Sequence, residues 1–106
     1  MEEKVIDLGA AKRSTKLNEG FLEAFGYFAE MGLKRLFGYD LGIPLKVKGT
    51  PSEIRSFTNA LNNEKKYMEA YKKHGLTDSR TLNNKGLLDK AVTTFQSATG
   101  LKWPFK

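Results

Sequence analysis

Apolar positions recur with helical spacing over residues 17–37, a segment rich in phenylalanine. At about 100° per residue, its large apolar side chains share one arc of roughly 140°, with Glu23, Glu30 and Lys34 opposite. The pattern predicts an amphipathic helix. Glycines recur inside this segment, and an internal glycine costs a helix about 1 kcal/mol relative to alanine. We therefore expect burial of the aromatic face, rather than helix propensity, to stabilise it.

The character of the chain changes after this helix. Pro44 and the neighbouring glycines disfavour a helix, whereas residues 45–48 alternate between apolar and basic, as a half-buried strand does. The pattern predicts one short strand near residues 43–48. A single strand needs a partner, and the candidates are residues 4–8 and a second copy of the chain.

Two further helices are predicted in the second half. Thr50 and Glu53 have the spacing of a capping box around Pro51, and Gly75 is suited to end the helix that follows. Residues 76–84 read as a polar loop. A third apolar stripe predicts a helix over residues 85–99 that ends at Gly100.

The predicted fold class is mainly α, a small three-helix domain with one short strand segment near residues 43–48. We expect residues 1–16 to be a flexible basic lead-in and residues 17–106 to form a single helical domain. The predicted core consists of Phe21, Phe25, Phe28, Leu36, Ile54, Phe57, Leu61, Met68, Leu88, Val92 and Phe95.

One segment resembles part of a known family. Residues 91–101 follow the A-V-x-x-F-Q-x-x-x-G-L pattern found at one end of peptidoglycan-binding modules. The central D-G-x-x-G turn of those modules is missing, and the same residues are also typical of an amphipathic helix with a glycine cap. The resemblance does not extend to the chain as a whole, and no family membership follows from it.

Charge is the compositional feature that bears on function. The chain has a formal net charge of +6, with eight Lys/Arg against seven Asp/Glu in residues 1–50 and ten against five in residues 51–106. A basic half suits a polyanionic partner such as nucleic acid, although a lysine-rich surface also keeps a small protein soluble.

The second predicted helix carries a candidate nucleic-acid-binding face. Arg55, Lys66 and Lys73 fall within about 20° of one another around its axis, with Asn59 and Asn62 beside them. Basic and amide side chains on one helix face can contact phosphates and base edges. The leading hypothesis is therefore a small basic accessory protein that binds nucleic acid mainly through phosphate contacts.

The alternative hypothesis is a structural or assembly subunit of a multi-protein or virus particle. Its candidate partner contacts are aromatic residues of the first helix and of the C-terminal tail, which could contact another protein or a second copy of the chain. These residues are Phe21, Phe25, Trp103 and Phe105. Trp103 is expected to pack, either within the chain or onto a partner. A membrane partner is not expected, because the polar side of the aromatic helix is mainly acidic.

Catalytic chemistry finds little support in the sequence. There is no cysteine, His74 is the only histidine, and no phosphate-binding glycine motif occurs. We expect no enzymatic activity, no catalytic residues, no metal site and no cofactor. The acidic N-terminus does not look like a secretory signal, so the expected location is the cytoplasm, or the inside of a virus particle or infected cell.

Overall fold

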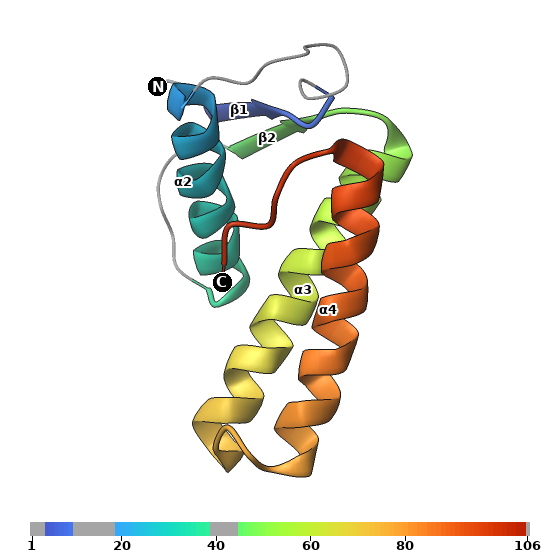
Figure 1. The fold of residues 1–106 in the computed structure, drawn as a ribbon. Coiled ribbons are helices and arrows are strands. Elements are labelled where there is room, and N and C mark those ends of the chain that lie inside the picture. Colours follow the sequence, from blue (N-terminus) through green and yellow to red (C-terminus); the bar gives the residue numbers. More distant parts are fainter. Residues whose placement is uncertain (1–3, 10–18, 39–44, 106) are drawn as a thin grey trace.

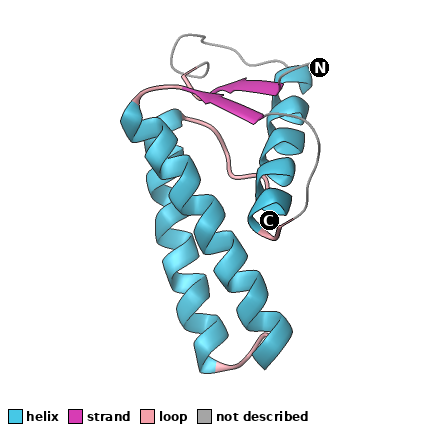
Figure 2. Ribbon diagram, turned by 180° about the vertical axis from the view of Figure 1, so that it is seen from behind, coloured by secondary structure: helices cyan, strands magenta, loops and turns pink. Residues whose placement is uncertain are grey.

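The computed structural model describes residues 4–9, 19–38 and 45–105. Its elements are β1 (Lys4–Asp7), α2 (Glu19–Leu36), β2 (Leu45–Lys48), α3 (Pro51–His74) and α4 (Ser79–Thr99). Helices α3 and α4 form a long antiparallel hairpin, α2 lies alongside part of it, and the two strands lie side by side near one end of the hairpin (Figures 1 and 2). The prediction of a mainly helical, three-helix domain with a short strand segment is confirmed.

The two strands form a parallel pair within the chain. Ile6 is the register partner of Val47, and beyond the strands the backbone N–H of Leu8 donates to the carbonyl of Lys48 at 2.8 Å. Parallel strands require a long crossover, which here includes α2. Of the two strand partners that the sequence left open, the structure uses the one within the chain.

Part of the expected N-terminal lead-in is packed against the body. Ile6 and Leu8 are 4% and 0% exposed and belong to the core. Residues 4–9 therefore do not form a free arm, since β1 and the turn after it are held by the sheet and by apolar contacts. Residues 1–3 and 10–16 of the predicted lead-in lie outside the described residues.

Helix α3 begins and ends at the predicted residues. The hydroxyl of Thr50 accepts a hydrogen bond from the Glu53 backbone N–H at 3.1 Å, and the Glu53 carboxylate accepts one from the Thr50 N–H at 2.8 Å. Pro51 occupies the first turn. The helix ends at Gly75, whose φ of +90° suits a residue without a side chain. Both ends depend on local hydrogen bonds, which is why the sequence could locate them.

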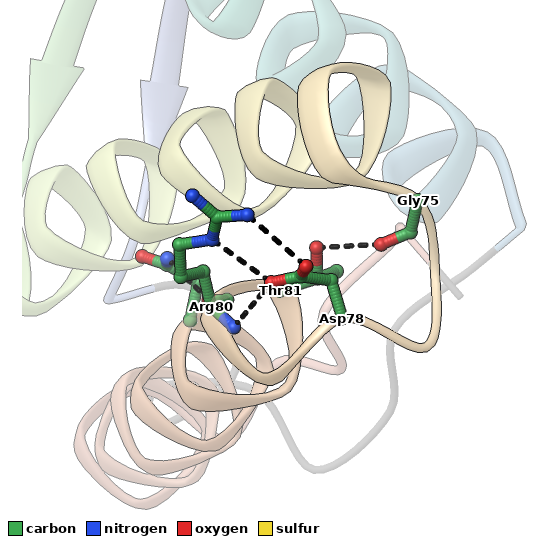
Figure 3. A network of polar contacts seen from close by, with 5 residues as sticks. Gly75, Asp78, Arg80 and Thr81 are labelled. Carbon is green, nitrogen blue, oxygen red and sulfur yellow. Dashed lines mark hydrogen bonds and ion pairs between the residues drawn. The ribbon is translucent and has the colours of Figure 1, made fainter.

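The predicted start of α4 was wrong. The helix begins at Ser79 rather than Lys85, so most of the polar segment over residues 76–84 is helical. Asp78 caps it, with Oδ1 accepting from the Arg80 backbone N–H at 2.9 Å, and the Thr81 hydroxyl donates to the Gly75 carbonyl at 2.6 Å (Figure 3). The buried Thr81 and the exposed Leu82 hide the amphipathic pattern of this first turn.

Aromatic rings from α2, α3, α4 and the C-terminal segment form the centre of the core. Phe95 stacks on Phe25 with ring centroids 5.9 Å apart, and it meets Phe57 at 5.8 Å and the edge of Trp103 at 5.3 Å. Most predicted core residues are buried, while Leu36, Ile54 and Met68 are partly buried around them. The side chain of Phe21 lies outside the described residues.

One costly glycine of α2 lies where this helix meets α3. A Cβ at Gly32 would come within 3.2 Å of Leu61 Cδ1. The missing side chain therefore allows the two helices to approach closely at this position. The packing gained there offsets part of the stability that glycine costs the helix.

Candidate binding surfaces

The predicted nucleic-acid-binding residues lie together on one side of α3. Arg55, Asn59, Asn62, Lys66 and Lys73 are all exposed. From Arg55 to Lys73 they span about 27 Å of helix at about 1.5 Å per residue. They lie opposite the buried side of α3, and we call this surface the outer face of α3.

The outer face carries uncompensated positive charge. Within the described part of the chain, Arg55, Lys66 and Lys73 form no ion pair. Glu69 shares this face, but its carboxylate pairs with the Lys65 ammonium at 3.5 Å. The local field of the outer face is therefore positive.

Two cations of α4 show the opposite situation. The Lys85 ammonium pairs with Asp89 at 3.3 Å, and the Arg80 guanidinium pairs with Asp78 at 3.0 Å. Arg80 also holds the pKa of the Asp78 carboxyl down at about 2, through hydrogen bonds to that carboxyl from its side chain and its backbone. Each of these cations is already paired with a carboxylate within four residues in the sequence, so it has less to gain from a ligand.

A hydrogen bond to Asn63 limits how Asn59 could contact a phosphate. The Asn59 side-chain oxygen accepts from Asn63 Nδ2 at 3.2 Å. Because the oxygen is occupied, the NH₂ group is the part of Asn59 best placed to donate to a phosphate oxygen.

The aromatic residues predicted as partner contacts are mainly core residues. Phe25 and Trp103 are 2% and 4% exposed, and both pack against aromatic rings of the same chain. Trp103 therefore packs within the chain, one of the two outcomes expected from the sequence. Phe105 is partly buried with its ring 5.5 Å from Trp103, and Phe21 falls outside the described side chains.

An aromatic cleft that the sequence did not reveal lies between α2, α3 and the C-terminal segment. This segment leaves α4 and crosses to α2 (Figure 1). The cleft has a volume of about 900 Å³. Its aromatic lining consists of Tyr27, Phe37, Tyr67, Tyr71 and Phe105. Some signal was present, because Tyr67 and Tyr71 are four residues apart and their rings meet at 5.4 Å, but only the fold brings α2 and the tail to them.

A buried carboxyl borders the cleft. Glu64 is 5% exposed, and its Oε1 accepts a hydrogen bond from Trp103 Nε1 at 2.8 Å. Burial raises the pKa of the Glu64 carboxyl above 4.5, and the Trp103 hydrogen bond opposes that rise. Because the bond joins mid-α3 to the C-terminal segment, Glu64 both positions the tail and contributes a titratable group to the cleft.

The two lysines that line the cleft, Lys34 and Lys72, are engaged by neighbouring groups, and Lys65 lies near one of the rings of the cleft. Lys34 pairs with Glu30 at 3.4 Å. The ammonium of Lys72 lies over the Phe37 ring, 5.6 Å from its centroid, and that of Lys65 lies 5.7 Å from the same centroid. Two ammonium groups thus lie over one aromatic ring that lines the cleft, the geometry of a cation–π contact.

Other chemistry is sparse over the residues described. No group of three His, Cys, Asp or Glu side chains there could hold a metal ion. None of the described helices is both long and apolar enough to cross a membrane. His74, at the end of α3, is partly buried.

Comparisons with protein-family models, curated proteins and solved structures found no match to this chain.

Proposed function

We propose that the protein binds nucleic acid through phosphate contacts made by the outer face of α3. The observation that carries the proposal is the row of Arg55, Lys66 and Lys73, which are exposed along one helix side and unpaired among the described residues. Cations without a protein partner can exchange their counterions for phosphates at little cost, and this exchange drives non-specific nucleic-acid binding.

The rest of this surface fits the same role. Asn59 and Asn62 lie beside the three cations and are exposed, so their amide groups can donate to phosphate or sugar oxygens. The one acid on the face, Glu69, is offset by Lys65. We expect the contacts to position the protein on the backbone without reading base sequence.

The test compares two variants of equal charge. The triple change R55E/K66E/K73E and the control K85E/K90E/K102E each lower the formal net charge from +6 to zero, and all six side chains are exposed. Fluorescence anisotropy with labelled duplex DNA and RNA would measure affinity at several salt concentrations. We expect the first variant to lose binding and the control to retain most of it.

Salt dependence gives a second readout. Three duplex phosphate contacts predict a slope of about −2.7 in log affinity against log salt. Equal losses of affinity in the two triple variants would mean that only net charge matters. An affinity that changes neither with salt nor in the outer-face variant would refute the proposal. Unchanged thermal unfolding would show that the outer-face variant still folds.

The alternative is a structural or assembly subunit, and two of the four residues expected to make its contacts, Phe25 and Trp103, are buried in the core. Phe105 is the described residue of that set that borders the cleft. Light scattering at several protein concentrations would reveal self-association, which is the case in which copies of this chain assemble without another protein.

A further inference from the structure

The aromatic cleft is a ligand site that the outer face does not explain. It opens beside Tyr67, Met68 and Tyr71, on the side of α3 away from Arg55, Lys66 and Lys73. Its volume of about 900 Å³ lies within the range of roughly 300–1,000 Å³ typical of small-molecule pockets. A nucleic acid on the outer face would not fill it.

The charges of the cleft disfavour an anion. Three carboxylates line it, those of Glu23, Glu30 and Glu64, against two ammonium groups, although the whole chain is basic. Of these ammonium groups, Lys34 is paired with Glu30 and Lys72 lies over a ring. A ligand entering the cleft therefore meets carboxylates whose charge is only partly offset.

Glu64 offers the most specific contact. Its Oε1 is held by Trp103. Oε2 is not part of that bond, and Glu64 is one of the residues that line the cleft. A carboxylate oxygen at this position can accept a hydrogen bond from a cationic donor, and such charge-assisted bonds are the strong ones.

The aromatic lining suits the same kind of ligand. Tyr27 from α2, Tyr67 from α3 and Phe105 from the tail can surround an apolar skeleton, and ring faces attract a cation. Glu64 is only 5% exposed, so the group that reaches it must be slender. From this geometry we propose that the cleft binds a small organic ammonium ion on an aromatic skeleton, with the ammonium at Glu64.

The experiment titrates the full chain with 2-phenylethylammonium, 2-phenylethanol and phenylacetate, which place a positive, a neutral and a negative group on similar skeletons. Trp103 is the only tryptophan, so its fluorescence reports on the bond to Glu64, and backbone amide NMR shifts locate the site. We expect the amine to bind at least about tenfold more tightly than the alcohol, the gain of one charge-assisted hydrogen bond, and phenylacetate to bind weakest.

Two matched variants test the role of Glu64. E64Q keeps an oxygen that can accept from Trp103 but removes the charge, so we expect it to lose about tenfold in affinity for the amine and to bind the alcohol as before. D89N removes an exposed carboxylate of α4 and should change neither affinity. The outer-face variant R55E/K66E/K73E should bind the amine normally, which separates this site from the nucleic-acid proposal.

Four results would overturn the proposal. They are equal affinity for the amine and the alcohol, an E64Q variant that binds the amine normally, NMR shifts confined to residues outside the cleft, and binding of a phenylalanine–arginine peptide with no binding of the small amine. The last result would assign the cleft to a protein partner instead.

Discussion

The two sides of α3 place similar residue types in different surroundings. On the outer face, charged groups stay in water, and the one acid there, Glu69, has a lysine partner. On the inner side, Glu64 is buried against Trp103 and borders an aromatic cleft. Glu64 and Glu69 are only five residues apart on the same helix, yet their carboxylates lie in different environments. Exposure follows from helical periodicity, whereas the chemistry of the inner side depends on what packs against it.

The largest expected difference between the two sides is in stability. Phe57 is 2% exposed and touches the rings of Phe25, Phe95 and Trp103, so F57A should lower the free energy of unfolding by about 3–5 kcal/mol. R55A, two residues away on the outer face, should change it by less than about 0.5 kcal/mol. Urea unfolding followed by circular dichroism would measure both. Similar values for the two variants would contradict the assignment of the sides.

A smaller effect is expected at the hydrogen bond that joins the inner side to the tail. W103F keeps an aromatic ring but removes the Nε1 donor, which leaves the Glu64 carboxylate without its partner in a buried position. We expect a loss of about 1–3 kcal/mol in the free energy of unfolding. In the E64Q background the same change should cost less, because a neutral amide is cheaper to leave unpaired. Equal costs in both backgrounds would show that the bond contributes no specific stability.

The smallest effect concerns pH. Because burial raises the pKa of Glu64 in the folded chain, the folded state holds this proton to higher pH than the unfolded state does. The contribution of Glu64 to stability is therefore greatest at or below pH 4.5 and declines as the pH rises through the folded pKa. E64Q cannot titrate, so the stability of E64Q relative to the wild type should increase with pH above 4.5 and then level off.

E69Q, which removes a carboxylate from the outer face, is the matched control for that experiment. Chemical unfolding at several pH values would measure all three proteins. A difference between E64Q and the wild type that is the same at every pH would mean that burial does not perturb Glu64.

Local signals in the sequence were sufficient for α3 and its outer face. The Thr50–Glu53 capping box and the glycine at position 75 act through hydrogen bonds that span a few residues, so they can be recognised without the fold. The exposure of Arg55, Lys66 and Lys73 follows from the 3.6-residue period once the apolar stripe is identified. Features that depend on residues close together in the sequence can therefore be predicted from the sequence alone.

Tertiary structure decided the strand pairing and the cleft, whereas the start of α4 has a local signal, the Asp78 cap, that the predicted polar loop missed. Strand β1 pairs with β2, which follows it in the sequence only after α2. The Glu64–Trp103 bond joins residues 39 positions apart. Nothing near Glu64 in the sequence shows that it is desolvated, because the residues that exclude water from it come from other segments of the chain.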